Sequence, residues 1–478
     1  MGVIKNPILP GFNPDPSVLR VGDDYYIATS TFEWYPGVQI HHSKDLIHWR
    51  LLTHPLTRKS QLDMTGNPTS GGIWAPCLSY DKGTFYLIYT DVKTWRANYK
   101  DCTNYLTTAT NIEGPWSEPI FLNSSGFDAS LFHDDDGRKW LVNMLWDHRK
   151  GRNPFAGILL QEYSPEEKRL VGPIKNIFQG TPIGLVEGPH LYKRNGYYYL
   201  LTAEGGTQYE HAATMARSTK IDGPYEVDPE NPILTSNRRP ELALQKAGHA
   251  SIVETQTGEW YMVHLCGRPV KELRCNLGRE TSIQRCQWTE DGWFQLENGT
   301  NSPQVEVVGP QIPEHPFPAE SVRDDFDNPE LSVHYATLRV LPDPTWLSLA
   351  ERPGYLRLRG RESLNSRHSQ SLVVRRMQAF HCEASTCVEF EPETFQQMAG
   401  LVAFYEVDNY YYLRISRDEM AGKSLAILTS IEGHTDEPLE DEVSIEGWDK
   451  CYLKVEINRE QMQFYYSADG EVWQAIGP

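Results

Sequence analysis

The sequence lacks the features of a membrane-spanning or nucleic-acid-binding chain. Among its 478 residues no apolar run approaches the ~20 residues that a helix needs to cross a bilayer. Basic residues are few, because 45 Lys and Arg stand against 64 Asp and Glu, and a net charge of −19 offers no basic face to a phosphate backbone. Phosphate-binding patterns of the Gly-x-Gly-x-x-Gly or Walker type are also missing from strand–helix contexts. We therefore expect no membrane, no nucleic acid and no redox or nucleotide cofactor as partners.

Cysteine is scarce as well. The eight cysteines are scattered along the chain without a Cys-x-x-Cys pair, which fits neither a disulfide framework nor a zinc site. The opening residues 1–7 have no basic stretch followed by an apolar core, so we expect no secretory signal peptide. Free thiols together with this N-terminus predict a cytoplasmic protein.

Aromatic residues and turn formers, in contrast, are abundant. The chain has 25 Tyr, 13 Trp, 36 Gly and 32 Pro, and its 39% of hydrophobic residues argues against disorder. This composition is typical of a large acidic protein dominated by β-structure. The length allows two or three domains.

One pattern occurs five times in residues 1–305. Each copy has a short apolar strand, a turn rich in Gly or Asp, and an aromatic strand, as in 187–191 followed by 196–200. The residues that open the copies are 59, 54, 59 and 62 positions apart, and they are Asp15, Trp74, Asp128, Glu187 and His249. Two hairpins per copy make a four-stranded blade, so we expect a five-bladed β-propeller over residues 1–305.

The remaining third of the chain has a different pattern. Five prolines between positions 303 and 318 interrupt regular structure and indicate a linker over residues 306–321. From residue 322 onward short aromatic strands recur, such as 410–415 and 451–457, with turn signals between them. This favours an antiparallel β-sandwich over residues 322–478, so the expected fold class is all-β.

Three of the five opening residues are carboxylic acids. The innermost strands of a propeller line its channel, so these residues should meet at one mouth. Hydrolysis of a glycosidic bond needs one carboxylic acid with a raised pKa and one ionised carboxylate, separated by ~6.5–9.5 Å when the mechanism inverts the anomeric centre. The trio therefore indicates a glycosidase.

The neighbours of each acid suggest its role. Asp15 lies between Pro14 and Pro16, which fix its backbone, and we interpret it as the general base. Glu187 has apolar neighbours whose desolvation should raise its pKa, which suits a general acid. Asp128 would be the third charge, which keeps the acid protonated and orients it.

Two opening positions are not acids. Trp74 alone would be a core residue, but its place in the repeat predicts a platform for a sugar. His249 lines the channel, binds a central cation or packs without a function, and the sequence leaves these alternatives open.

Six motifs closely resemble the β-xylosidases of glycoside hydrolase family 43, in order and at consistent spacing from Asn6 to the C-terminus. They are residues 11–17, 28–34, 72–76, 126–130, 187–190 and 277–281. The resemblance implies a propeller followed by a concanavalin-like sandwich, and an exo-acting, inverting mechanism. By matching motif, Asp15 is the general base, Asp128 the pKa modulator and Glu187 the general acid. The implied sugar-binding residues are Phe32, Trp74, Phe127, Thr207, His249 and Arg279. We expect the Arg279 fork to donate to sugar hydroxyls and to Asp128.

The chain departs from the family pattern in two places. The connection between Val270 and Leu277 looks shorter than in those relatives, which would alter the rim of the pocket. The chain also stops at Pro478, where the relatives continue for a few dozen residues that supply the last strands of the sandwich and an aromatic loop at the active-site mouth. We therefore expect the sandwich to be incomplete.

The expected function is an exo-β-1,4-xylosidase that releases xylose from the non-reducing ends of xylooligosaccharides, with α-L-arabinofuranosidase as a side activity. One alternative is an enzyme acting mainly on arabinofuranosides or arabinan. A more remote one is an inactive carbohydrate-binding propeller. No cofactor is required. Calcium near His249, which some relatives hold, and a homo-oligomeric state are left open.

Overall fold

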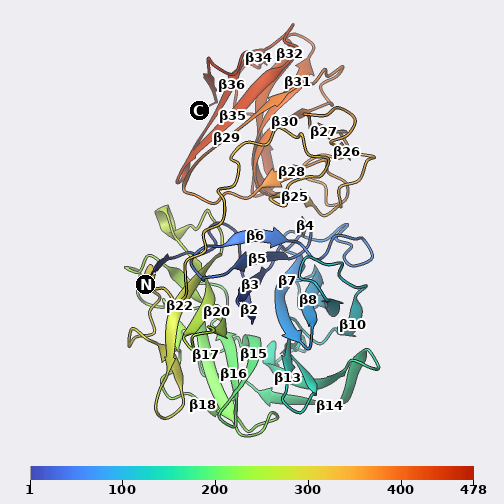
Figure 1. Ribbon diagram of the computed structural model, residues 1–478. Helices are drawn as coiled ribbons and strands as arrows, with labels where there is room; N and C mark the ends of the chain where they lie inside the picture. Colours follow the sequence, from blue (N-terminus) through green and yellow to red (C-terminus); the bar gives the residue numbers. More distant parts are fainter. Residues whose placement is uncertain (1, 478) are drawn as a thin grey trace.

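The computed structural model describes residues 2–477 as two β-rich bodies, a propeller below and a sandwich above (Figure 1). The only helical element in this part of the chain is the short 3-10 turn η1 (Lys271–Leu273). No helix within residues 2–477 is long and apolar enough to cross a membrane. The expected all-β class, a five-bladed propeller followed by a sandwich, is confirmed.

Each blade is an antiparallel sheet of strands that follow one another in the chain. Blade 1 consists of β2 (Ser17–Val21), β3 (Asp24–Thr29), β5 (Gln39–Ser43) and β6 (Arg50–Thr53). Blade 2 consists of β7 (Gly72–Asp81), β8 (Thr84–Thr94), β9 (Asp101–Ala109) and β10 (Ile120–Asn123). Blade 3 consists of β11 (Ser130–His133), β12 (Lys139–Trp146), β13 (Phe155–Ser164) and β14 (Arg169–Phe178). Blade 4 consists of β15 (Glu187–Arg194), β16 (Tyr197–Glu204), β17 (Ala212–Ser218) and β18 (Glu226–Val227), with β19 (Leu234–Thr235) also on β17. Blade 5 consists of β20 (Gln245–Glu254), β21 (Trp260–Gly267), β22 (Glu280–Trp288) and β23 (Phe294–Leu296).

The apolar core of the propeller lies between neighbouring blades. One cluster joins blades 1 and 2 through Ile40 and Leu78, and another joins blades 4 and 5 through Leu201 and Ile252. Each fully buried aliphatic side chain contributes about 1.5–3 kcal/mol relative to exposure. Because the strands are apolar on both faces, each blade depends on its neighbours for burial, and the ring forms as a whole.

In every blade a residue with left-handed backbone lies just before the innermost strand or within its first five residues. These residues are Asp15 (φ 55°), Ala75 (φ 36°), Asp128 (φ 55°), Gly188 (φ 56°) and His249 (φ 44°). In blades 2, 4 and 5 the pairing with the next strand shifts register across this residue, as at a β-bulge. A bulge redirects the side chains beside it, and here those side chains lie at the channel mouth.

In two blades the expected opening residue lies one position before the left-handed residue. Trp74 and Glu187 each precede the left-handed residue, which is Ala75 in blade 2 and Gly188 in blade 4. Glycine adopts this conformation without the steric cost that a Cβ atom brings. The longer Glu side chain lines the same cavity as Asp15 and Asp128 from one position earlier in the chain.

The ring is closed by the N-terminal segment. β1 (Val3–Lys5) pairs with β24 (Glu306–Val308), which follows blade 5. The buried side chain of Asn6 donates to the carbonyls of Ile283 (2.7 Å) and Gln304 (2.8 Å) and accepts from the Ile283 N–H (2.8 Å). One amide thus joins the start of blade 1 to the outer part of blade 5.

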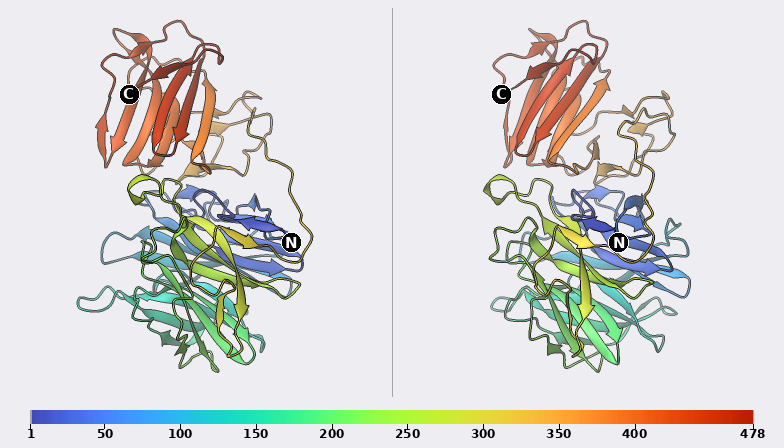
Figure 2. Two further views of the ribbon diagram at one scale, coloured as in Figure 1. Left: turned by 90° about the vertical axis from the view of Figure 1, so that its left-hand side faces the viewer. Right: turned by 60° about the vertical axis from the view of Figure 1, so that its left-hand side comes forward.

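The proline-rich segment continues from this closure to the sandwich along one side of the propeller (Figure 2). Its first residues form β24, between Pro303 and Pro310, so the prolines bound a strand instead of excluding one. One sheet of the sandwich contains β29 (His381–Val388), β35 (Cys451–Asn458), β36 (Gln461–Ser467) and β37 (Gln474–Ile476). The facing sheet contains β30 (Ala399–Glu406), β31 (Asn409–Asp418), β32 (Gly422–Ile431), β33 (His434–Asp436) and β34 (Val443–Ser444). A hairpin of β26 (Leu347–Ser348) and β27 (Arg357–Leu358) precedes them.

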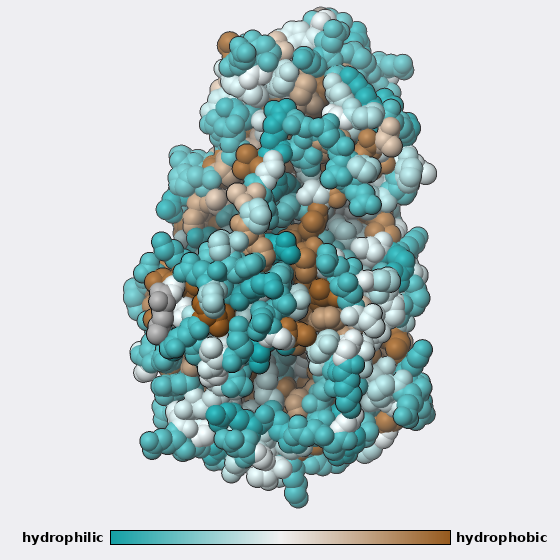
Figure 3. Space-filling model, in the orientation of Figure 1, coloured by the Kyte–Doolittle hydropathy of each residue, from teal (hydrophilic) through white to brown (hydrophobic). Residues whose placement is uncertain are grey.

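A small sheet connects the two domains. β4 (Trp34–Tyr35) leaves blade 1 and pairs with β25 (Tyr335–Leu338), which pairs with β28 (Val373–Arg375). The buried Arg339 continues this contact, since its N–H donates to the Glu33 carbonyl at 2.9 Å. Figure 3 shows apolar side chains gathered in the waist between the domains, on a surface that is otherwise mostly hydrophilic.

Asn6→Ala tests the closure of the ring. We expect the free energy of unfolding to fall by about 1–3 kcal/mol, because the substitution leaves buried backbone groups of blade 5 without partners. The measurement is thermal or urea unfolding, with the exposed Asn328→Ala as the control. An unchanged unfolding midpoint in Asn6→Ala would mean that this amide does not hold the ring.

Candidate active site

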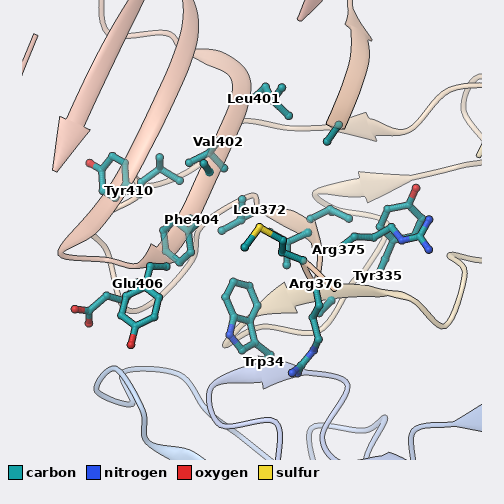
Figure 4. Close-up of a pocket in the computed structure, with 18 of the residues that line it drawn as sticks. Trp34, Tyr335, Leu372, Arg375, Arg376, Leu401, Val402, Phe404, Glu406 and Tyr410 are labelled. Atoms are coloured by element: carbon teal, nitrogen blue, oxygen red, sulfur yellow. The ribbon is translucent and has the colours of Figure 1, made fainter. Parts of the chain in front are cut away.

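A cavity of about 3560 Å³ lies between the channel mouth of the propeller and the sandwich. Figure 4 shows its end at the domain junction, where Trp34 from blade 1 faces Phe404 and Leu372 from the sandwich side. All nine residues expected at the site line this cavity: Asp15, Phe32, Trp74, Phe127, Asp128, Glu187, Thr207, His249 and Arg279. The repeat pattern therefore brings together side chains from all five blades.

Asp15 is held as an anion. Arg279 Nη1 donates to its Oδ1 at 2.6 Å, and the Ser30 hydroxyl donates to its Oδ2 at 2.7 Å. His249 Nδ1 lies 3.9 Å from Oδ1. Burial alone would raise the pKa of Asp15, but Arg279, His249 and Ser30 together hold that pKa below its usual value. An ionised carboxylate that keeps its charge in a buried site can act as a base.

The loop that carries Asp15 is fastened to blade 5. Glu280 accepts the Gly11 N–H at 2.9 Å and is itself paired with both forks of Arg268 at 2.7 and 2.8 Å. The Thr281 hydroxyl donates to the Asn13 carbonyl at 2.6 Å. Because Glu280 is fully buried, the paired Arg268 is needed to balance its charge.

The pKa values of Glu187 and Asp128 are shifted in the opposite direction from that of Asp15. Both are buried, and the Gly188 N–H donates to Asp128 Oδ2 at 3.1 Å. Burial, then the charges of Asp128 and Asp15, raise the pKa of Glu187 well above its usual value. Burial also raises the pKa of Asp128. His249 lowers this pKa, whereas the charge of Asp15 raises it further. The pocket therefore holds a proton on Glu187 while Asp15 stays ionised.

We expected Arg279 to contact Asp128, but it pairs with Asp15 instead. Its side chain pairs with Asp15, because its own carbonyl accepts the Asn13 N–H at 2.8 Å and so fixes it beside the base loop. The guanidinium also lies over the Phe32 ring, 5.3 Å from the centroid. Arg279 is thus a partner of Asp15 and of the aromatic wall.

Aromatic rings form the wall beside the acids. The Trp74 ring lies 6.3 Å from Phe32 and meets Phe127 edge-on at 5.3 Å. The Trp74 indole N–H donates to the Ser70 carbonyl at 2.7 Å, which fixes the ring. Such walls pack against the C–H faces of sugars while the charged groups meet the hydroxyls.

Several residues of the site were not identified from the sequence. Trp146 extends the aromatic wall beside Phe127 (6.3 Å), and Lys100 places its ammonium 4.4 Å from the Trp146 ring centroid. Ser30 lies inside the motif of residues 28–34, but a serine at this position does not indicate a contact with Asp15. His211 is fully buried and lies against Gly248 of blade 5, and nothing in the sequence around His211 indicates this contact.

Thr207 and His249 complete the predicted set. Thr207 follows β16 at the rim of the cavity, whereas His249 is buried close to Asp15. Within residues 2–477 no group of three or more His, Cys, Asp or Glu side chains is arranged to hold a metal ion. Calcium near His249 stays an expectation from the sequence.

A propeller pocket with one ionised carboxylate, one protonated carboxyl group and an aromatic wall defines a glycoside hydrolase. Residues 4–294 match the glycosyl hydrolases family 43, and residues 323–478 match the β-xylosidase C-terminal concanavalin A-like domain. The chain belongs to glycoside hydrolase family 43, as the motifs had indicated.

Individual relatives are similar over nearly their full length. The chain is 53% identical to a β-xylosidase of Bacillus subtilis (strain 168), with 99% of this chain and 90% of the relative covered. It is also 53% identical to xylosidase/arabinosidase 43B of Humicola insolens, covering 100% and 89%. A crystal structure of a xylan β-1,4-xylosidase from Bacillus halodurans C-125 is 64% identical, with a TM-score of 0.99 and coverage of 99% and 91%.

Asp128→Asn tests the electrostatic coupling of the trio. The charge of Asp128 raises the pKa of Glu187, so its removal lowers that pKa. If Glu187 must be protonated to act, activity is lost as pH rises through its pKa, and the alkaline limb of kcat should move to lower pH. The measurement is a pH profile of aryl glycoside hydrolysis beside wild type and the exposed Asp135→Asn. An alkaline limb that stays in place in Asp128→Asn would contradict the coupling.

Proposed function

We propose that this protein is an inverting exo-β-1,4-xylosidase that removes xylose from the non-reducing ends of xylooligosaccharides. The observation that supports this most directly is the opposite displacement of the Asp15 and Glu187 pKa values within one aromatic-walled pocket. The names of the relatives favour a xyloside as substrate. The family membership supports inversion.

In the proposed reaction Asp15 accepts a proton from a water molecule while that water attacks the anomeric carbon. Glu187 donates its proton to the glycosidic oxygen, and the bond between that oxygen and the anomeric carbon breaks. The products are α-xylose and a shortened oligosaccharide with a free hydroxyl group. Asp128 helps to keep Glu187 protonated before the step, because an ionised Glu187 would lie beside two other anions, Asp128 and Asp15.

The other six residues are proposed to bind the terminal sugar. Phe32, Trp74 and Phe127 supply the apolar wall described above. Arg279 has further N–H groups besides the one given to Asp15, and these can donate to hydroxyls. His249 and Thr207 lie near the base and at the rim respectively.

A second candidate is an α-L-arabinofuranosidase, as a side activity or as the main one. It is favoured by the similarity to the Humicola insolens enzyme, whose name includes both activities. Both pentoses offer similar hydroxyls to the same pocket. An inactive sugar-binding propeller is disfavoured, since it would not need three buried acids of unequal pKa.

We also propose a cytoplasmic location and a reaction without a cofactor. All eight cysteines are free, and five of them are buried, which suits a reducing compartment. The acid–base pair above accounts for the hydrolysis with water as the only other reactant.

Asp15→Ala tests the proposed activity. We expect wild type to hydrolyse an aryl β-xyloside faster than an aryl α-L-arabinofuranoside. In the variant kcat should fall by about 10²–10⁴-fold on either substrate, because the attacking water loses its base. Asp23→Ala, in the exposed turn after β2, is the control and should keep full activity. Undiminished turnover in Asp15→Ala would overturn the role of the base, and a faster arabinofuranoside reaction in wild type would select the second candidate.

The products of xylotetraose test the mode of action. An exo-acting, inverting enzyme should release only xylose and xylotriose at first, with the new xylose as the α-anomer before mutarotation. Early spectra by proton NMR, together with chromatography, measure both. Xylobiose as the first product, or β-xylose, would contradict the proposal.

A further inference from the structure

The loop that leads to Asp15, residues 10–14, is held by two blades of the propeller. Blade 5 binds it through Arg279 and Thr281, as described above. Blade 1 binds it through the His41 ring, 3.0 Å from Asn13 Oδ1, and through the Ser30 N–H, which donates to the Pro14 carbonyl at 3.1 Å. These contacts leave the Phe12 carbonyl to be bound from elsewhere.

That carbonyl is bound from the other domain. Arg376 directly follows β28, and Figure 4 shows its guanidinium directed towards the propeller while the neighbouring Arg375 extends away beside Tyr335. Arg376 Nη1 donates to the Phe12 carbonyl, and its guanidinium carbon lies 5.3 Å from the Phe12 ring centroid. One side chain thus contacts both the backbone and the ring of Phe12.

Backbone packing reinforces this contact next to Phe12. Gly11 has φ 79°, and a Cβ atom placed on it would lie 2.5 Å from the Met377 carbonyl oxygen and 3.3 Å from Gln378 Cα. The segments around Gly11 and Met377 are therefore in van der Waals contact, and only glycine fits at position 11. Residues 376–378 form a third support of the base loop, on the sandwich side.

The surroundings of Arg376 are unusual for a structural arginine. Burial lowers its pKa to about 10, and the carboxylate of Glu33 opposes this effect. His41 and His54 are the other titratable groups close enough to feel its charge. Arg376 is partly buried, and a cation removed from water is costly unless its hydrogen bonds and counter-charge compensate it; here the compensation comes from the propeller.

We propose that Arg376 is a positioning residue for the general base, through which the sandwich domain fixes the loop that carries Asp15. The inference rests on the proposed role of Asp15 as the base. It assigns the sandwich an indirect part in the chemical step, through the position of the proposed base, in addition to covering the pocket.

The proposal makes a specific statement about Asp15. When residues 10–14 shift, the short contacts of Asp15 with Arg279 and Ser30 lengthen, and burial then raises the pKa of Asp15. Because the base must be ionised, the acid limb of kcat/KM should move to higher pH. The charged or titratable groups that face Asp15 from the other blades are His211, His249, Asp128 and Glu187. They are unchanged by a substitution at position 376.

The first experiment reads the contact without any need for activity. Amide hydrogen exchange of full-length Arg376→Met, Arg376→Lys and Arg375→Met is compared with wild type by mass spectrometry. We expect faster exchange in peptides covering residues 8–15 for Arg376→Met, and a smaller increase for Arg376→Lys, which keeps the charge and one donor. Arg375→Met, the matched control on the adjacent residue, should match wild type. Unchanged exchange of residues 8–15 in Arg376→Met overturns the proposal, whatever the substrate proves to be.

The second experiment reads the consequence for catalysis. On whichever aryl pentoside wild type hydrolyses, kcat of Arg376→Met should fall about 10–100-fold, because a displacement near 1 Å is enough for such a loss. The affinity for xylose, measured by calorimetry, should stay within about twofold, since Arg376 is not expected to touch the terminal sugar. The acid limb should move up in Arg376→Met and partly return in Arg376→Lys. A lower unfolding temperature with wild-type kcat and an unmoved acid limb overturns the positioning role. Failure of wild type to hydrolyse any pentoside would instead overturn the proposed function, while the exchange experiment still decides the contact.

Discussion

The site depends on a backbone constraint that recurs in each blade. A residue in the left-handed region, where a non-glycine side chain costs about 1–2 kcal/mol, lies just before the innermost strand or within its first five residues. The turn at this residue directs Asp15, Asp128 and His249, and the residue before Ala75 and Gly188, towards the channel mouth. Four small strains and one glycine, offset by the cores between the blades, thus create a pocket with residues from the whole ring.

The three acids differ because their partners differ. Asp15 has a guanidinium and a hydroxyl group at hydrogen-bond distance, whereas Glu187 has burial and two neighbouring negative charges. The same carboxyl chemistry therefore gives an ionised carboxylate on one side of the pocket and a protonated carboxyl group on the other. In an apolar pocket without such partners, burial would raise the pKa of all three acids and keep them protonated.

The sequence was sufficient for the parts that recur or that carry strong turn signals. Five copies of one pattern predicted the propeller, and Asp15, Asp128 and Glu187 stood out because each opened a copy of the pattern. It could not predict contacts between distant segments, such as Arg279 with Asp15 instead of Asp128, because side-chain direction follows from how blade 5 meets the N-terminal loop. The one-residue offset of Trp74 and Glu187 from the left-handed residue was not predicted for a similar reason, since a bulge shifts the register without a marker in composition. The pairing of β4 with β25 also depends on tertiary packing alone.

The distribution of the supports for Asp15 along the chain has a consequence for synthesis. The proposed base lies near the start of the chain, but Arg279, Glu280 and Thr281 lie in the last blade, and Arg376 lies beyond it. A ribosome therefore makes the proposed base first and these four supports more than 260 residues later, as the separation of 264 between Asp15 and Arg279 shows. Domains generally fold from the N-terminus as they emerge, yet this loop can take its final form only when both domains are present. A partly synthesised chain would hold the aromatic residues proposed to bind the sugar before the proposed base could activate water.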